Sequence, residues 1–527
     1  MKKKTKGIIM FLFLGGIMMT SGVVIGIPGI LPENSASVNT KTGTPLDNYP
    51  DVQRAQFCGS EDMAKSNHYV TEYKIPTPCT QPLAITSDPI GNLWFTQTNT
   101  GKVAKFDPIT EQFTEYQNPR WPLGARSMMW GIDYSPDASI WFTDEATDGI
   151  WKFSIPDEKY ERTDYPKSAD SLPQRLSIEG SNIIVNDFTG SKLTLLDVTQ
   201  NTEGISFLNI PSPVEGSVTA GFTVDPQKNI WYTNWIFKTG GVLAKLNQEK
   251  IFQIGNNETQ LFDLIDIYNF PPGMNTPNGI ASDDDGKIWI LDTSSNFFFS
   301  FDPESESFTK YITSNPQLSS YGNSSGVIKS PVSRPYWAAF NQDGKLVFNE
   351  QTANRIAIFD PIKETLVEYM IPSKNPNWAD CEGIPDCGLA QVFDFTISGG
   401  KIWFTEWAEN NIGFVDTTLP TYVDVESDKN KLILKKGEQT QINLSLIPNT
   451  RTDSDFSFTS SSTAQFSDLI IKHDAPNSFK LNDDSTKKIE ITISANANAV
   501  PDIHKILLSI QTDDLVVSKF VTVIIEQ

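Results

Sequence analysis

The stretch Lys401-Ile-Trp-Phe-Thr-Glu406 decides the fold, because versions of this phrase recur along the whole chain. Its short run of β-branched and aromatic residues, bounded by turn-forming residues, is typical of a strand. Aligned on their third position, the seven versions have Trp94, Trp141, Ile184, Trp231, Trp289, Val347 and Trp403. Spacings run from 43 residues (Trp141 to Ile184) to 58 residues (Trp231 to Trp289). Repeats of this size are typical of β-propellers rather than helical solenoids.

Each repeat divides into four short strands separated by turn residues. In the first repeat an apolar strand around Leu83-Ala-Ile-Thr86 leads to an Asp/Gly turn and then to the Trp-Phe strand. A third strand, Lys102-Val-Ala-Lys-Phe106, and a fourth, Phe113-Thr-Glu-Tyr116, follow. Alternating apolar residues between Gly, Pro, Asn and Asp predict one four-stranded blade per repeat.

The first and last repeats indicate how the ring closes. The seventh repeat ends at Asp416 without an outer strand, whereas an unassigned outer strand, Val70-Thr-Glu-Tyr-Lys-Ile75, precedes the first repeat. An N-terminal strand that completes the last blade would remove an exposed sheet edge. The sequence therefore predicts an all-β fold, a closed seven-bladed β-propeller over residues 67–419.

The repeat stops after residue 419, and residues 420–527 keep only alternating strands such as Gln441-Ile-Asn-Leu-Ser-Leu446. About a hundred residues of short strands and turns predict an immunoglobulin-like β-sandwich. Residues 33–66, rich in Ser, Thr, Asn and Pro, are expected to be a linker.

Composition narrows the partners. The 527 residues include 42 Lys and Arg against 64 Asp and Glu, a net charge of −22. Such a surface repels nucleic acid and attracts cations, so we expect no nucleic-acid partner.

The N-terminus predicts export. Basic residues at positions 2–4 and 6 precede an uncharged apolar run that ends at Pro32. Residues 1–32 are therefore a signal anchor, either a retained transmembrane helix or a cleaved signal peptide. We expect an extracytoplasmic chain whose only membrane contact is this anchor, with a secreted chain as the alternative.

Four cysteines, Cys58, Cys79, Cys381 and Cys387, fit an oxidising compartment as two disulfides. The sequence alone allows three pairings, and the spacing does not match a zinc site.

Polar residues end the seven second strands, at the edge where the innermost strands begin. They are Gln97, Asp144, Asp187, Asn234, Asp292, Glu350 and Glu406. We expect them to converge at the mouth of the central channel, where a Mg²⁺ or Ca²⁺ ion would neutralise the carboxylates. The alternative is that these side chains cap the adjacent turns.

Aromatic residues gather in the loops that lead into the innermost strands, on the same face. They are Trp121, Trp130, Tyr336, Trp337 and Trp378. An aromatic rim above a polar floor predicts a binding site for a small organic ligand or an extracellular protein; ordinary loop packing is the alternative.

The unit Gly-x-Ile-Trp-Phe-Thr-Glu followed by Asn410-Asn-Ile-Gly413 resembles the streptogramin (virginiamycin B) lyase family over roughly residues 69–417. Members of that family are seven-bladed propellers that linearise type B streptogramins by magnesium-dependent elimination. The resemblance implies a histidine in a Pro-His-Gly-Ile segment, a glutamate fourteen residues later and a second histidine three residues beyond.

This chain departs from the family at those positions. Its histidines are His68, His473 and His504, all outside the repeats. Val392 lies fourteen residues before Glu406, where the first histidine would be. Proton transfer near neutral pH normally uses an imidazole, so streptogramin lyase activity is not expected.

A weaker resemblance lies in Thr276-Pro-Asn-Gly-Ile280, with Asp292 fourteen residues after Asn278. This is similar to the metal-binding segment of gluconolactonase (SMP-30-like) propellers, although Asn-Gly is also a common turn dipeptide. The predicted metal ligands are therefore Asn278, Asp292, Glu350 and Glu406.

Two functions follow as alternatives. The first is a membrane-tethered binding or scaffold module for an organic ligand or an extracellular protein, with a divalent cation at the channel mouth. The second is a metal-dependent lyase or lactonase acting on a cyclic ester or lactone. The sequence does not decide whether the chain is an enzyme.

Overall fold

The computed structural model describes residues 58–527 apart from 60–62, 122–126, 146–147, 166–170, 198–206, 237–238, 255–257, 324–331, 466 and 482–484. The predicted anchor at 1–32 and most of the predicted linker at 33–66 lie outside these residues. In the part of the chain that is described, no helix is long and apolar enough to cross a membrane.

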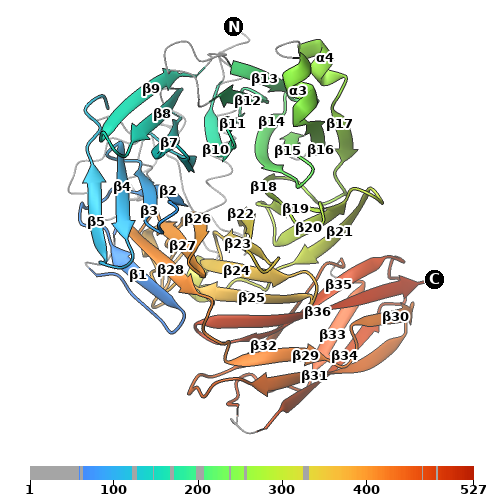
Figure 1. Cartoon of the computed structure of the whole chain (residues 1–527). Helices are drawn as coiled ribbons and strands as arrows, with labels where there is room; N and C mark the ends of the chain where they lie inside the picture. The colour runs from blue at the N-terminus through green and yellow to red at the C-terminus, as the bar shows by residue number, and fades with distance from the viewer. Residues whose placement is uncertain are drawn as a thin grey trace, which may run out of the picture.

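The described strands of the repeats form seven antiparallel blades of four strands arranged as a ring, six of them separate sheets and one continuous with a larger sheet. Figure 1 shows the first strand of each sheet facing the middle of the ring. These innermost strands are β2 (Pro82–Ser87), β6 (Ile132–Ser135), β10 (Pro173–Glu179), β14 (Val218–Val224), β18 (Pro277–Ser282), β22 (Pro335–Phe340) and β26 (Val392–Ser398). The second strands carry the recurrent phrase and are β3 (Leu93–Gln97), β7 (Ser139–Asp144), β11 (Asn182–Asp187), β15 (Asn229–Ile236), β19 (Ile288–Asp292), β23 (Leu346–Glu350) and β27 (Lys401–Glu406).

The third and outer strands complete the blades. The third strands are β4 (Lys102–Asp107), β8 (Gly149–Ser154), β12 (Lys192–Asp197), β16 (Gly240–Asn247), β20 (Phe297–Asp302), β24 (Arg355–Asp360) and β28 (Asn411–Asp416). The outer strands are β5 (Gln112–Tyr116), β9 (Lys159–Asp164), β13 (Phe207–Pro211), β17 (Asp266–Asn269), β21 (Ser307–Ile312), β25 (Thr365–Met370) and β1 (Val70–Lys74). Blades are numbered one to seven from β2 to β26. The short helices α3 (Gln248–Ile254) and α4 (Glu258–Phe262) connect β16 to β17.

The N-terminal strand closes the ring as the sequence predicts. β1 pairs antiparallel with β28, with Val70 opposite Val415 and Lys74 opposite Asn411. The seventh blade therefore combines the two ends of the propeller, and no third strand is left with a free edge there.

The recurrent tryptophan fixes the turn before it. In blade 1 the Trp94 indole donates to Asp88 at 3.0 Å, and Asp88 also accepts from the backbone N–H of Asn92 at 2.9 Å. Trp231 and Trp289 repeat this bond to Asp225 and Asp283. The Asp of the Asp/Gly turn thus holds the first two strands of a blade in register.

A second repeated contact joins each blade to the next. A side chain near the end of each second strand, or directly after it in blade 5, donates to a carbonyl at or near the start of the next innermost strand. The seven bonds, 2.5–3.1 Å long, are Thr96 to Met129, Thr143 to Gln174, Asn186 to Thr219, Thr233 to Pro277, Thr293 to Pro335, Asn349 to Val392 and Thr405 to Leu83. The last bond runs from blade 7 to blade 1, so the contacts form a closed circle.

Residues 420–527 form two further sheets. One consists of β29 (Val423–Ser427), β31 (Gln439–Pro448), β34 (Lys487–Ala495) and β33 (Leu469–His473), in that order. The other contains β36 (Leu515–Glu526), β35 (Ile503–Gln511), β32 (Ser457–Ser462) and β30 (Lys431–Lys435). The immunoglobulin-like classification of this sandwich stays a prediction.

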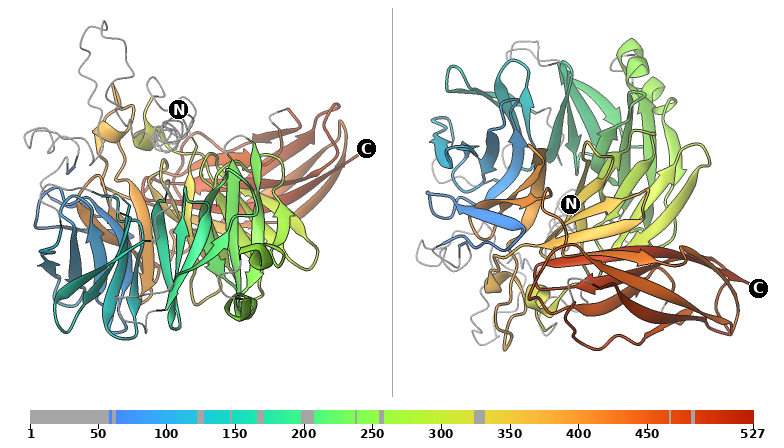
Figure 2. Two further views of the ribbon diagram at one scale, coloured as in Figure 1. Left: turned by 90° about the horizontal axis from the view of Figure 1, so that it is seen from above. Right: turned by 60° about the horizontal axis from the view of Figure 1, so that its bottom comes forward.

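The sandwich is attached to the propeller by strand pairing, which the sequence did not reveal. β25, the outer strand of blade 6, pairs antiparallel with β36 from Thr365 opposite Lys519 to Tyr369 opposite Leu515. One eight-stranded sheet therefore runs from the ring into the sandwich, which lies against the side of the ring (Figures 1 and 2). Beside this joint a groove of about 1010 Å³ separates the turns of blade 6 from β29.

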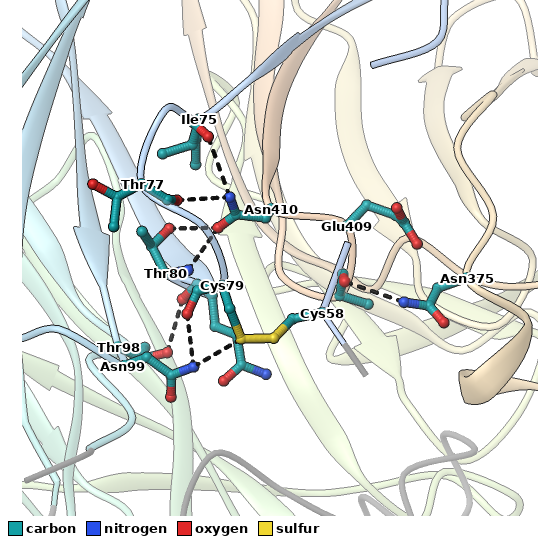
Figure 3. The surroundings of a disulfide bond; sticks show 12 residues. Cys58, Ile75, Thr77, Cys79, Thr80, Thr98, Asn99, Asn375, Glu409 and Asn410 are labelled. Carbon is teal, nitrogen blue, oxygen red and sulfur yellow. Dashed lines mark hydrogen bonds between the residues drawn. A yellow bond between two sulfur atoms is a disulfide. The ribbon is translucent and has the colours of Figure 1, made fainter. Parts of the chain in front are cut away.

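The cysteines pair as Cys58–Cys79 and Cys381–Cys387, with Cα atoms 5.2 Å and 5.5 Å apart. Figure 3 shows the first disulfide beside Asn410, which accepts from the Thr80 backbone N–H at 2.7 Å and donates to the Thr77 carbonyl at 2.9 Å. The Cys58–Cys79 loop contains all of β1, so the ring-closing strand lies within a covalently closed loop.

Replacing Thr96 with Val should lower the free energy of unfolding. Thr96 Oγ1 donates to Met129 and accepts from the Ala84 N–H, both at 3.0 Å, and all three groups are buried. Leaving a buried carbonyl and N–H unpaired costs about 1–3 kcal/mol. Denaturant unfolding measures this loss, and Thr114→Val, on the exposed face of β5 in the same blade, should leave stability nearly unchanged. Equal stability of the two variants would contradict the structural role of the contact.

Replacing Cys58 and Cys79 with Ser should also destabilise the ring. The 21-residue separation of these cysteines exceeds the 6-residue separation of Cys381 and Cys387. Loop-closure entropy therefore predicts a loss of roughly 3 kcal/mol for the first disulfide and about 1 kcal/mol less for the second. Thermal unfolding of the two double variants tests this order, and peptide mapping without reductant tests the pairing.

Candidate functional site

An ion pair between an arginine and an aspartate lies in the middle of the ring, where the central channel was expected. Arg175 lies on β10 of blade 3 and Asp394 on β26 of blade 7, and their Nη1 and Oδ1 atoms are 2.8 Å apart. Blades 3 and 7 are not neighbours in the ring, so this ion pair crosses the axis. Both side chains are buried.

Further blades contact this pair. The Arg175 guanidinium lies 3.7 Å from the ring centroid of Trp337 on β22 and donates to the Phe393 carbonyl at 3.1 Å. Asp394 accepts from the backbone N–H of Ile85 in blade 1 at 3.0 Å. Burial raises the pKa of Asp394, and the positive charge of Arg175 opposes that rise. The pair therefore connects four blades through the middle of the ring.

Aromatic rings pack together beside the ion pair. Trp130, which precedes β6, lies 6.4 Å from Tyr336 on β22 and 5.5 Å from Phe393 on β26, measured between ring centroids. Trp378 and Trp407 stack edge to face at 5.0 Å in the same cluster. We call Trp130, Tyr336, Phe393, Trp378 and Trp407 the axial aromatic cluster.

The carboxyl group of Glu145, beside the axial aromatic cluster, has a raised pKa. Glu145 follows β7, is half-buried and accepts from the Trp130 indole N–H at 2.5 Å. Burial, reinforced by the nearby carboxylates of Asp144 and Asp148, raises the pKa of Glu145 to about 7. Near neutral pH this carboxyl can therefore either release or take up a proton.

The seven residues predicted to surround the channel mouth are instead engaged within their own blades. In blade 1, Gln97 donates to Glu115 of the outer strand at 2.7 Å. Asp144 accepts from Trp151 of the third strand at 3.3 Å, and Asn234 accepts from Thr219 at 2.8 Å. All seven side chains are buried. Groups of the same blade therefore contact these side chains, and their convergence at the mouth of the channel stays a prediction.

The remaining four residues also contact groups of their own blades. Asp187 accepts from Gly190 and Asp292 from Thr276, both through backbone N–H groups, as turn caps do. Glu350 lies 3.7 Å from Arg355 of β24, and Glu406 accepts from Asn411 of β28 at 2.7 Å.

Two features of the structure disfavour a divalent cation at the predicted metal ligands. Among the described residues, no three His, Cys, Asp or Glu side chains are grouped so that they could hold a metal ion. Burial and the neighbouring carboxyls Glu368 and Glu72 raise the pKa values of Glu350 and Glu406, which disfavours the charged forms that bind cations. Asn278 lies half-buried at a bulge of β18. A Mg²⁺ or Ca²⁺ ion at Asn278, Asp292, Glu350 and Glu406 stays a prediction.

The predicted ligand-binding aromatics separate into three environments. Trp130, Tyr336 and Trp378 join the axial aromatic cluster, and Trp337 lies under Arg175. Trp121 instead packs against Trp151, 5.9 Å away, between blades 1 and 2. Their role in ligand binding stays a prediction.

The described parts of the long loops before β22 and β26 lie on one face of the ring. They carry α5 (Leu318–Tyr321) and η1 (Pro376–Trp378), in the yellow and orange segments that rise from the ring in the left view of Figure 2. A bridge between Gly322 and Asp380 joins the two loops, and the Cys381–Cys387 disulfide closes the second.

Sequence reasoning missed Arg175, Asp394 and Glu145. The available signal was a charge of each sign inside two innermost strands, where burial demands compensation. Glu145 carried no signal, because it follows the recurrent phrase in an ordinary turn. The histidines lie away from the axis: His68 before β1, His473 on β33 and His504 on β35.

Comparisons with known proteins agree with this architecture. No family model matches the chain, and no curated protein is similar in sequence. The structure defines the class as a seven-bladed β-propeller. Among solved structures, a streptogramin B lyase is 21% identical with a TM-score of 0.50, over 66% of this chain and 96% of that one. Virginiamycin B lyase from Staphylococcus aureus is 19% identical with a TM-score of 0.50, over 66% and 98%. The propeller therefore has a fold similar to that of virginiamycin B lyase.

Replacing Arg175 with Met should destabilise the protein by about 3–5 kcal/mol at neutral pH, because Asp394 would remain buried without its partner. The loss should shrink as pH falls toward the unfolded pKa of an aspartate, since a protonated Asp394 carries no charge to compensate. Unfolding at several pH values measures both effects. The double variant Arg175→Met, Asp394→Asn is the control and should recover much of the loss. Pair replacement that recovers nothing would show that packing, not charge, explains the effect.

Proposed function

We propose that this chain is an extracytoplasmic, membrane-tethered propeller that binds an organic ligand or an extracellular protein on its aromatic face. The observation that carries the proposal is the paired state of the axial residues. Arg175 and Asp394 neutralise each other, and the rings of the axial aromatic cluster pack together. Charges compensated in this way are suited to holding a binding surface in shape rather than to chemistry.

Glu145 is the polar contact we assign to this surface. It adjoins Trp130 and is close enough to Tyr336 to influence the ionisation of its phenol. A half-buried carboxyl among aromatic rings offers a directional hydrogen bond within an apolar surround, the usual arrangement of a small-molecule site.

The extracytoplasmic location rests on two features. Two disulfides are consistent with an oxidising compartment. The basic and then apolar N-terminus supplies the proposed tether. Fractionation of cells expressing the full chain tests this: the protein should remain with membranes after alkaline wash and be digested by protease added outside.

A second candidate is a lyase or lactonase acting on a cyclic ester, and Glu145 favours it because its pKa of about 7 suits proton transfer. A fold similar to that of the streptogramin lyases is compatible with this candidate.

One experiment separates the two functions. The full-length chain, freed of metal by chelation, is titrated calorimetrically with Ca²⁺ and Mg²⁺ and then with a type B streptogramin and a simple lactone. The proposed function predicts binding without turnover, weakened about tenfold by Glu145→Gln through loss of one charged hydrogen bond. Glu115→Gln, whose half-buried carboxyl accepts from Gln97 within blade 1, is the matched control. Metal-dependent turnover abolished by Glu145→Gln would favour the enzyme instead.

A further inference from the structure

The strand β29 has a free edge beside the joint between the propeller and the sandwich. Among the described strands, β29 is the first of its sheet and pairs with β31 alone. In an antiparallel pair, only alternate residues bond to the partner strand. The N–H of Asp428, directly after β29, donates to the Asn443 carbonyl at 3.1 Å, so the even-numbered residues of the strand bond to β31. The backbone groups of Val423, Val425 and Ser427 therefore point to the other side.

The groove of about 1010 Å³ lies along this edge and has an apolar floor. Ile358 on β24, Val367 on β25 and Val517 on β36 lie opposite one another in three adjacent strands of the eight-stranded sheet and line the groove. Val425 of β29 lines it as well. An extra strand paired with β29 would lie over this apolar row, as one sheet of a sandwich lies over the other.

Negative side chains outnumber positive ones in the lining of the groove. Three lysines line it together with five carboxylates, which are Asp343, Asp360, Glu364, Asp424 and Glu426. Lys505 neutralises Glu364, and the ammonium of Lys519 donates to the Lys363 carbonyl. Asp424 and Glu426 are exposed on the outer face of β29. The groove therefore attracts a cationic chain.

We propose that the free edge of β29 binds an extended, cationic segment of a partner protein by strand addition. The backbone of the segment pairs with Val423, Val425 and Ser427. Directly opposite residues of paired strands point to the same face of a sheet. Lysine or arginine side chains of the segment therefore lie opposite Asp424 and Glu426, and apolar side chains between them face Val367.

A second copy of this chain fits the edge less well than a cationic partner. Two β29 strands paired antiparallel with Val425 opposite Val425 would bring Asp424 of each copy opposite Glu426 of the other. Like charges directly opposite each other destabilise a strand pair. The net charge of −22 on each chain also opposes their association.

This groove is separate from the axial aromatic cluster. Asp343 lies in the turn between β22 and β23, and Asp360 begins the turn between β24 and β25. Because the strands of a blade are antiparallel, both turns lie at the end of the blade away from the loop that leads into its innermost strand. The proposal therefore adds a second binding site, on the opposite face of the ring.

Titration of the full chain with synthetic peptides tests the proposal. The probe is a peptide of about seven residues that alternates lysine and valine, a length that suits a single strand. One control has the same sequence with methylated backbone amides, so it keeps the charge and cannot donate to β29. A second control has glutamate in place of lysine. The probe should bind at least about tenfold more tightly than either control, because each control loses several contacts.

Hydrogen exchange shows where the probe binds. The amides of Val425 and Ser427 point away from β31, so their exchange should slow when the probe is added. The Glu426 amide, which bonds to β31, should change far less. Slower exchange of all three amides to the same extent would indicate general stabilisation and would overturn strand addition.

The double variant Asp424→Asn, Glu426→Gln should weaken binding of the probe by about three- to tenfold, because exposed ion pairs contribute little individually. Asp284→Asn with Glu304→Gln is the matched control, since it removes two exposed carboxylates from turns of blade 5 and should bind the probe as the wild type does. Absence of probe binding, equal binding of the methylated peptide or an equal loss in both double variants would overturn the proposal. Self-association of the chain that β29 variants abolish would assign the edge to a second copy instead.

Discussion

One buried hydrogen bond per blade holds this ring together, from the end of a second strand to the first carbonyls of the next innermost strand. Neighbouring blades contact each other mainly through apolar side chains, which attract without fixing an angle or a register. The bond from Thr405 to Leu83, which joins blade 7 to blade 1, has the same threonine donor and carbonyl acceptor as the bond from Thr96 to Met129. A side chain that satisfies a carbonyl in the next sheet fixes both, because misalignment would leave a polar group buried and unpaired.

The positions of the innermost strands determine what fills the middle of the ring. Once seven innermost strands are held at one distance from the axis, their side chains must fill the centre or admit water. Here the Arg175–Asp394 pair and several aromatic rings occupy it. The charges face low-dielectric surroundings, so each is tolerable only with its partner. Glu145 lies at the border of this region, which explains why its protonation remains adjustable near neutral pH.

Blades 6 and 7 differ from the other blades, because blade 7 closes the ring and blade 6 is joined to the sandwich. Blade 7 takes its outer strand from the N-terminus and has Asn411, which donates to Glu406, where blade 6 has Arg355. Blade 6 instead extends through β25 into the sandwich and retains Arg355 between its carboxyls. The aromatic contacts of Tyr69 with Tyr369 and Tyr422 connect the two boundaries.

The sequence by itself determined the number of blades, the strand order and the closing role of β1, because strand alternation and a recurrent phrase are local signals. It also placed Trp130 and Tyr336 in the loops that lead into the innermost strands. Only the tertiary structure decided which side chains meet. Arg175 and Asp394 are 219 positions apart, and the orientation of Glu350 and Glu406 depends on donors supplied by other strands. The sequence could not determine the cysteine pairing or the pairing of β25 with β36 for the same reason. Contacts between distant segments leave no periodic pattern in the chain.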